Sequence, residues 1–122
     1  AVVGSPLLDM LRYDKLLAGA SWVGEYGSPS VPEQRAFLER ITPYQNLNPG
    51  ETFPLIFIYT STKDDRVHPG HARKYAARLR ELGVPFLYYE NTDGGHQANA
   101  NLREAARRRA LEYMYLTQRL MD

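Results

Sequence analysis

The sequence has the length and composition of one globular domain: 122 residues, 43% apolar and 24% charged, with a formal net charge of +1. This charge balance produces no general field that would attract nucleic acid or an anionic membrane, so we expect neither as a partner. The apolar runs are far shorter than the ~20 residues that a membrane span needs. Without cysteine, the chain cannot form disulfides, thiolate metal sites or a cysteine nucleophile.

The N-terminus shows no secretory signal, because no basic segment precedes an apolar stretch with a cleavage site. The chain opens directly on the strand-like residues 1–3, as though cut from a longer protein. We expect a cytoplasmic protein, since the lack of disulfides fits a reducing compartment. A periplasmic location stays open, because any signal peptide would lie upstream.

The first half of the chain predicts one short strand and one helix. Residues 1–3 are β-prone, and residues 7–20 predict a short helix or irregular packing. Glycines, serines and prolines mark residues 24–32 as a loop. Residues 33–41 have the apolar spacing of a helix, and residues 42–53 are loop again.

The second half of the chain gives clearer patterns. Residues 54–60 are a nearly continuous run of β-branched and aromatic side chains, which is typical of a strand buried on both faces of a parallel sheet. Residues 71–82 predict a helix that Gly83 ends, and residues 85–90 predict another strand. Residues 102–121 predict a long helix.

This alternation predicts a single α/β domain over residues 1–122, with about three mostly parallel strands and flanking helices. Apolar side chains recur at helical spacing in each helix, and those of the second helix are expected to face inward. They are Phe37, Leu38 and Ile41 in the first helix, Tyr75, Leu79 and Leu82 in the second, and Leu102, Ala106, Tyr113, Met114, Leu120 and Met121 in the third.

Polar loops follow the two strands of the second half, at the sheet edge where active sites of parallel sheets gather. Asp64 lies in the first loop and His96 in the second. A carboxylate that binds one imidazole nitrogen fixes the tautomer, and the other nitrogen can then take the proton of a serine hydroxyl. Asp64 and Asp65 could also be two catalytic carboxylates, but adjacent residues of an extended loop tend to point apart.

Three motifs along the chain stand in an ordered series. They are Asp9-Met10-Leu11, Trp22-Val23-Gly24-Glu25-Tyr26-Gly27, and Asp64-Asp65-Arg66-Val67 with the later Gly94-Gly95-His96. In this order the chain resembles, over nearly its whole length, the C-terminal part of the catalytic domain of the prolyl oligopeptidase (prolyl endopeptidase) family of serine peptidases. The resemblance implies the C-terminal portion of an α/β-hydrolase fold.

The resemblance also implies roles for individual residues. Asp64 matches the acid of the catalytic triad and His96 matches its base. Arg66 matches a residue that grips a substrate carbonyl, and Trp22 one that stacks on the substrate proline. The other pocket-lining positions are matched by Tyr26, Val67 and Leu7. An aromatic and aliphatic pocket suits the flat proline ring, and we expect no metal and no cofactor.

The family's serine nucleophile has no match in these residues. It lies in a Gly-x-Ser-x-Gly elbow, and that motif does not occur here; the serines are Ser5, Ser21, Ser28, Ser30 and Ser61. The oxyanion hole and the β-propeller of the family are also missing from the sequence. We therefore expect a partial α/β-hydrolase domain that lacks both the nucleophile elbow and the propeller.

Two of the candidate binding residues have simpler interpretations. Trp22 could be a core tryptophan without a role in binding. Arg66 could be paired with Asp65 or Glu25 at the surface.

Two other clusters could suggest binding sites. His68 and His71 lie close together and could bind a metal, but no carboxylate or cysteine completes the set. Residues 107–109 are three arginines, which suggests a nucleic-acid patch. Successive helical residues spread around the helix, and Glu104 and Glu112 lie nearby, so a solvated helical face is the favoured interpretation.

The leading functional interpretation is a fragment of a serine peptidase that hydrolyses short peptides after proline. The whole enzyme would be active, whereas the isolated chain would be inactive because the serine is missing. Two alternatives stay open: a non-enzymatic or split-protein module of the same fold, and a fragment of an acylpeptide or ester hydrolase. The expected partners are a peptide substrate and the missing N-terminal part of the catalytic domain.

Two structural expectations follow from this interpretation. A carboxylate oxygen of Asp64 should lie within about 3.5 Å of an imidazole nitrogen of His96. The strand at residues 1–3 should be left with an unpaired edge, through which the isolated chain would form a homo-oligomer, most simply a homodimer.

Overall fold

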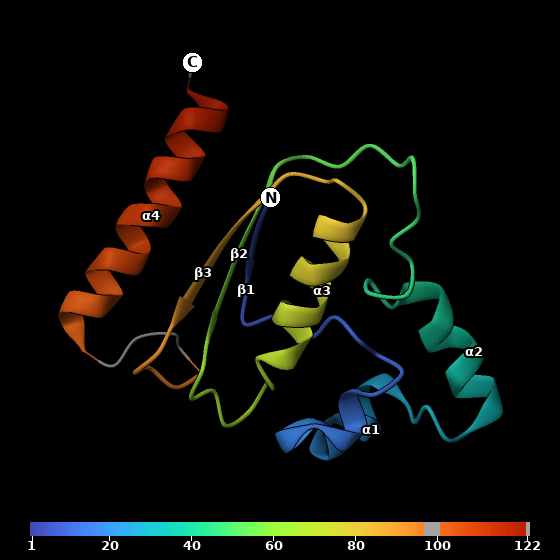
Figure 1. The fold of residues 1–122 in the computed structure, drawn as a ribbon. Coiled ribbons are helices and arrows are strands. Elements are labelled where there is room, and N and C mark those ends of the chain that lie inside the picture. Colours follow the sequence, from blue (N-terminus) through green and yellow to red (C-terminus); the bar gives the residue numbers. More distant parts are fainter. Residues whose placement is uncertain (97–100, 122) are drawn as a thin grey trace.

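The computed structural model describes residues 1–96 and 101–121 and contains one sheet of three parallel strands (Figure 1). The strands are β1 (Val2–Gly4), β2 (Ile56–Ser61) and β3 (Phe86–Asn91). Their order is β1-β2-β3, and both neighbouring pairs are parallel. This confirms the predicted α/β fold and places the three strand ends at one edge of the sheet.

The helices lie near their predicted positions, with small shifts at the ends. They are the 3-10 helices η1 (Tyr13–Lys15) and η2 (Leu17–Trp22), and the α-helices α1 (Val23–Tyr26), α2 (Pro32–Ile41), α3 (Gly70–Glu81) and α4 (Leu102–Leu120). Of the two structures predicted for residues 7–20, the structure contains short 3-10 turns rather than an α-helix. Gly83 follows α3 with φ of +69°, the left-handed conformation expected of a helix-ending glycine.

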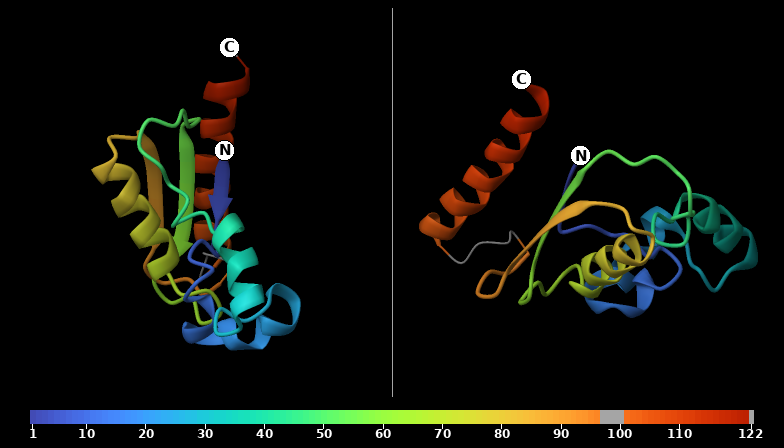
Figure 2. Two further views of the ribbon diagram at one scale, coloured as in Figure 1. Left: turned by 90° about the vertical axis from the view of Figure 1, so that its right-hand side faces the viewer. Right: turned by 45° about the horizontal axis from the view of Figure 1, so that its top comes forward.

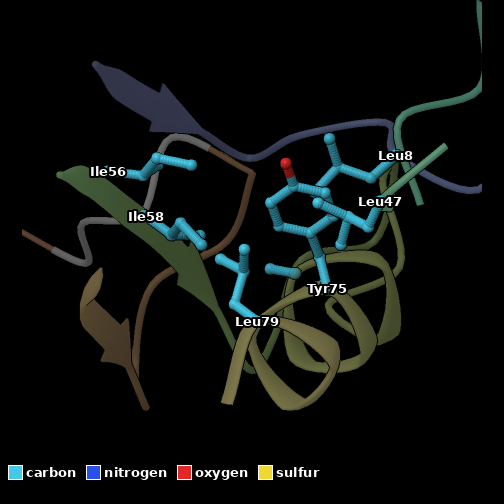
Figure 3. Packing of buried hydrophobic residues seen from close by; sticks show 7 residues of the cluster. Leu8, Leu47, Ile56, Ile58, Tyr75 and Leu79 are labelled. Atoms are coloured by element: carbon cyan, nitrogen blue, oxygen red, sulfur yellow. The ribbon is translucent and has the colours of Figure 1, made fainter. Parts of the chain in front are cut away.

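The main core lies between the sheet and α3. Ile56 and Ile58 of β2 face Tyr75 and Leu79 of α3, as predicted for these two helical residues (Figure 3). The remaining fully buried members of this cluster are Leu8, Leu47 and Ala72, and Leu82 packs against it half-buried. This packing fixes α3 against β2, just beyond the loop that carries Asp64.

The opposite face of the sheet is covered by α4, which lies alone on that side (Figures 1 and 2). Because side chains alternate along a strand, Phe57 and Tyr59 point away from α3. The ring of Phe57 lies 5.8 Å from that of Tyr115, and the Arg108 guanidinium lies 4.8 Å from the centre of the Tyr59 ring. Helices therefore lie on both faces of the sheet.

The apolar residues at helical spacing in α4 do not face the sheet. The large ones among them are exposed, from 58% for Met114 to 89% for Leu102, whereas the buried residues of α4 are Arg108 and Tyr115. At about 100° per residue, Arg108 and Tyr115 lie roughly opposite Leu102. The apolar pattern therefore marks a different side of α4 from the one that meets the sheet.

The apolar side of α2 is only partly buried. Leu38 is fully buried, but Phe37 and Ile41 are 48% and 46% exposed. Leu38 packs with Met10 and Tyr13 in a second, smaller cluster away from the main core. The described helices include none that is both long and apolar enough to cross a lipid bilayer.

Candidate active site

Asp64 lies in the loop after β2, with its carboxylate turned inward. The residue is 4% exposed, and its Oδ1 atom accepts hydrogen bonds from the main-chain N–H groups of Arg66 (2.9 Å) and Val67 (3.0 Å). The neighbouring Asp65 is exposed, so the two carboxylates point apart as expected. Asp64 is therefore held as a buried acceptor by its own loop.

His96 follows β3 and meets Asp64 across the edge of the sheet. Its Nδ1 atom lies 2.9 Å from Oδ2 and 3.1 Å from Oδ1 of Asp64, which confirms the predicted contact. Because a carboxylate only accepts, Nδ1 carries the proton and Nε2 keeps its lone pair. The side chain of His96 remains 36% exposed. This geometry leaves Nε2 able to accept a proton from another group.

The pairing of β2 with β3 brings the two loops together. Ser61 and Asn91, the last residues of these strands, are register partners, and the Thr62 N–H donates to the Asn91 carbonyl (2.9 Å). Asp64 and His96 thus leave the sheet from the same rung.

Three polar residues that the sequence analysis missed bind the His96 loop. The Ser5 hydroxyl donates to the His96 carbonyl (2.9 Å), the Ser61 hydroxyl donates to the Gly94 carbonyl, and Asn91 accepts from the Gly94 N–H (2.6 Å). An Asx residue at the end of a strand, followed by glycines, is a turn signal that could have pointed to Asn91.

Two of the predicted pocket residues pack around the smaller hydrophobic cluster. Leu7 and Trp22 are half-buried against Met10, Tyr13 and Leu38. Trp22 therefore contacts the core, as its simpler interpretation expects, and keeps part of its ring accessible.

Tyr26 belongs to the same region but is more exposed, at 41%. Its ring meets the ring of Tyr13 edge-on at 5.8 Å, and the Tyr13 hydroxyl donates to the carbonyl of Gly27 (2.6 Å). Leu7, Trp22 and Tyr26 thus all belong to the region of the smaller hydrophobic cluster.

Arg66 and Val67 lie beside Asp64 instead. Val67 is buried, whereas Arg66 is exposed. The ion pairs found among residues 1–96 and 101–121 do not include Arg66, so its suggested pairing with Asp65 or Glu25 is wrong. The Ala18 N–H donates to the Arg66 carbonyl (3.2 Å), which ties the Asp64 loop to the segment that leads into Trp22.

A buried polar contact fixes the Asp9 segment to α3. The Nδ1 atom of His71 accepts from the main-chain N–H groups of Leu8 (3.3 Å) and Asp9 (3.0 Å), and Lys74 forms an ion pair with Asp9. Burial lowers the pKa of His71 to about 4, so the imidazole is neutral at pH 7. Burial alone would raise the pKa of Asp9, but hydrogen bonds from Lys74 and Gln45 outweigh it and lower that pKa.

The histidine pair and the arginine run take ordinary structural positions. His68 accepts from the Gly70 N–H through Nδ1 (2.9 Å), and the part of the chain that the structure describes contains no cluster of three metal-binding side chains. Arg107 and Arg109 are exposed, as the favoured interpretation expects. Arg108 is buried and donates to Glu112 (3.2 Å), so for this residue the prediction of a solvated face is wrong.

The fold agrees with comparisons to known proteins. The model of the prolyl oligopeptidase family matches residues 1–122. The chain belongs to this family. Its three parallel strands and flanking helices correspond to the C-terminal part of the α/β-hydrolase domain of prolyl oligopeptidases.

Relatives from this family cover the chain closely but are much longer. An uncharacterized peptidase, y4nA, of Sinorhizobium fredii is 57% identical over 99% of the chain, and the prolyl endopeptidase of Elizabethkingia miricola is 35% identical over 85%. A post-proline cleaving enzyme from Rickettsia typhi superposes with a TM-score of 0.90 over 95% of the chain, at 33% identity. The chain spans about 17%, 15% and 17% of these proteins, respectively.

Proposed function

We propose that this chain supplies the acid and the base of a serine peptidase active site that cleaves short peptides after proline. The observation that carries the proposal is the contact of His96 Nδ1 with both carboxylate oxygens of Asp64, at 2.9 and 3.1 Å. Such a contact fixes the imidazole tautomer and stabilises the imidazolium that forms during the reaction.

The proposed reaction uses the free nitrogen of His96. A serine hydroxyl gives its proton to Nε2 while its oxygen attacks the carbonyl carbon of the proline residue. The protonated imidazole then donates that proton to the departing amine as the C–N bond breaks. Water, activated by the same nitrogen, hydrolyses the acyl-enzyme and restores the serine. Asp64 stays ionised throughout and holds the ring in place.

The remaining candidate residues would bind the substrate. Arg66 is exposed, and its donors are available for a substrate carbonyl. Leu7 and Trp22 pack against the cluster that contains Tyr13, and Tyr26 contacts Tyr13, so these three side chains offer an aromatic and aliphatic surface suited to a proline ring. Val67 would support this region from its buried position beside Asp64.

The attacking serine would come from polypeptide outside these 122 residues. The sequence contains no Gly-x-Ser-x-Gly motif, and Ser5 and Ser61 donate their hydroxyl protons to the main-chain carbonyls of His96 and Gly94. The isolated chain should therefore show no peptidase turnover, since loss of the nucleophile alone costs about a millionfold in related triads.

The test is Asp64→Asn in the full polypeptide that the gene encodes. An amide in place of the carboxylate favours the wrong imidazole tautomer, so kcat on a proline-containing chromogenic peptide should fall about 10⁴-fold. Asp65→Asn is the matched control, because Asp65 is exposed beside Asp64, and it should retain nearly full activity.

Two results would contradict the proposal. One is equal activity of the Asp64→Asn and Asp65→Asn proteins. The other is serine-dependent turnover by the isolated chain, with a fluorophosphonate label on one of its five serines.

A further inference from the structure

Both main-chain polar groups of Gly94 are held by side chains. Its N–H donates to Asn91 Oδ1 (2.6 Å), and its carbonyl accepts the hydrogen bond of the Ser61 hydroxyl. Ser61 and Asn91 are 0% and 4% exposed, and Gly94 is buried. Water therefore does not replace these bonds easily, and the position of Gly94 depends on the side chains of Ser61 and Asn91.

The two side chains come from the last rung of the sheet. Ser61 ends β2, Asn91 ends β3, and the two residues are register partners. Asn91 is itself held, because its amide nitrogen donates to Glu104 of α4 (3.0 Å) and its Oδ1 also accepts from the Asp93 N–H (2.8 Å). The rigid sheet thus extends through these side chains into the turn before His96.

Only Gly95 separates Gly94 from His96. The His96 carbonyl is bound by Ser5, which follows β1, and the imidazole is bound by Asp64. Because both polar main-chain groups of Gly94 and the carbonyl of His96 are fixed, the main chain can present the imidazole in few orientations. The orientation that it presents places Nδ1 on both oxygens of Asp64.

We propose that Ser61 and Asn91 are positioning residues for His96. They would hold Gly94 so that the imidazole remains bound to the Asp64 carboxylate with Nε2 directed to the reacting serine. Neither residue would touch the substrate. This inference rests on the proposed function for its catalytic consequence, but not for the placement of the ring. A displacement of about 1 Å in such a group can cost about a hundredfold in rate.

The first experiment follows the His96 Nδ1 proton by NMR in the 122-residue chain, without reference to activity. The parent chain should show the low-field signal of an imidazole proton bound to a carboxylate. Ser61→Ala and Asn91→Ala should lose or broaden it. Ser61→Thr, which keeps the hydroxyl, should retain it.

The matched control is Thr62→Ala. Thr62 is exposed, and its hydroxyl donates to Glu90 (2.6 Å) rather than to the His96 loop. Its removal deletes a hydrogen bond beside Ser61 and should leave the imidazole signal unchanged. Amide signals of the core residues Ile58 and Leu79 report whether each variant is folded. If Ser61→Ala does not fold, Ser61→Cys replaces it, since a thiol is similar in shape but a weak donor.

The second experiment measures kcat and KM in the full polypeptide that the gene encodes. Ser61→Ala and Asn91→Ala should lower kcat about tenfold to a hundredfold and change KM by less than about twofold, because the substrate pocket is intact. A full polypeptide without activity would contradict the proposed function and leave the NMR result to decide the positioning role. An unchanged imidazole signal in folded Ser61→Ala (or Ser61→Cys) and Asn91→Ala chains would overturn that role.

Discussion

His71 is a buried imidazole whose hydrogen bonds require it to be neutral. Its Nδ1 atom accepts from two main-chain N–H groups, so the ring proton must lie on Nε2. Protonation would place a second proton at Nδ1 against these donors. The imidazole is 2% exposed, so water cannot easily compensate. Asp9 and Lys74 stand beside it as an ion pair.

This arrangement predicts a loss of stability in mild acid. The pKa of His71 is about 4 in the folded chain against 6.5 in the unfolded chain, so the unfolded state binds more protons between these values. The contribution of His71 to the free energy of unfolding should be fully present above about pH 6.5. The free energy of unfolding should fall by up to about 3 kcal/mol as the pH decreases to about 4. Urea denaturation across this range measures the effect.

The control for this prediction is His71→Asn. Asparagine keeps an acceptor oxygen near the position of Nδ1 but does not titrate. Its stability should therefore change less between pH 6.5 and 4 than that of the parent chain. The pKa of Asp9 is lowered from 3.8, so Asp9 affects the free energy of unfolding mainly below pH 3.8, outside this range. Identical pH dependence of the two chains would refute the assignment to His71.

At the residue scale, the sequence predicts the contacts that follow from strand order alone. Asp64 and His96 follow parallel strands, and the ends of such strands meet at one sheet edge, so their contact was predictable. Ser5 and His71 were missed because each binds the main chain of a segment far away in sequence. No local pattern encodes such a contact.

At the scale of elements, α3 is held to the sheet mainly by its buried apolar side chains. Leu79 is fully buried in the cluster that includes Ile58, so Leu79→Ala leaves a cavity that the core cannot easily close. We expect a loss of about 2–5 kcal/mol in the free energy of unfolding, measured by urea titration. Leu102→Ala is the control: its side chain is 89% exposed, and the change should be within about 0.5 kcal/mol. Comparable losses in both would show that α3 does not depend on this packing.

The two long helices differ in how far the sequence could predict them. In α3 the apolar residues lie on one side, and Tyr75 and Leu79 of that side are buried. In α4 apolar residues occupy more than one side, and Tyr115 faces the sheet with Arg108, whose guanidinium lies over an aromatic ring. A count of apolar residues cannot select the side on which an arginine is buried.

At the scale of the whole molecule, no strand among residues 1–96 and 101–121 pairs with the outer edge of β1. The carbonyl of Ala1 and the N–H of Ser5 bond to β2, so the intervening polar groups of Val2 and Gly4 face away from it. Val2 and Val3 are only half-buried. We propose that the isolated chain forms a homodimer through this edge, because unpaired strand edges readily pair with a second copy.

Val2→Pro tests this proposal. Proline removes the outward N–H of Val2 and is tolerated on edge strands, so the pairing with β2 should survive while the dimer weakens. Val3→Pro is the contrasting variant, because Val3 faces β2 and its change should destabilise the fold. Sedimentation equilibrium at micromolar concentration measures the mass. A parent chain that remains a 13.9 kDa monomer would exclude the dimer.

The Asp64 loop lies inside one strand–helix–strand unit, β2–α3–β3, which runs from Ile56 to Asn91, and the His96 loop follows directly after that unit. A slip of β3 along β2 by two residues would keep every side chain on its own face, and the apolar core could still close. The same slip would carry the His96 loop about 6.6 Å away from Asp64 at ~3.3 Å per residue. Misaligned molecules could therefore fold compactly and still have no usable proton acceptor, so the accuracy of this one strand pairing sets the fraction of competent molecules.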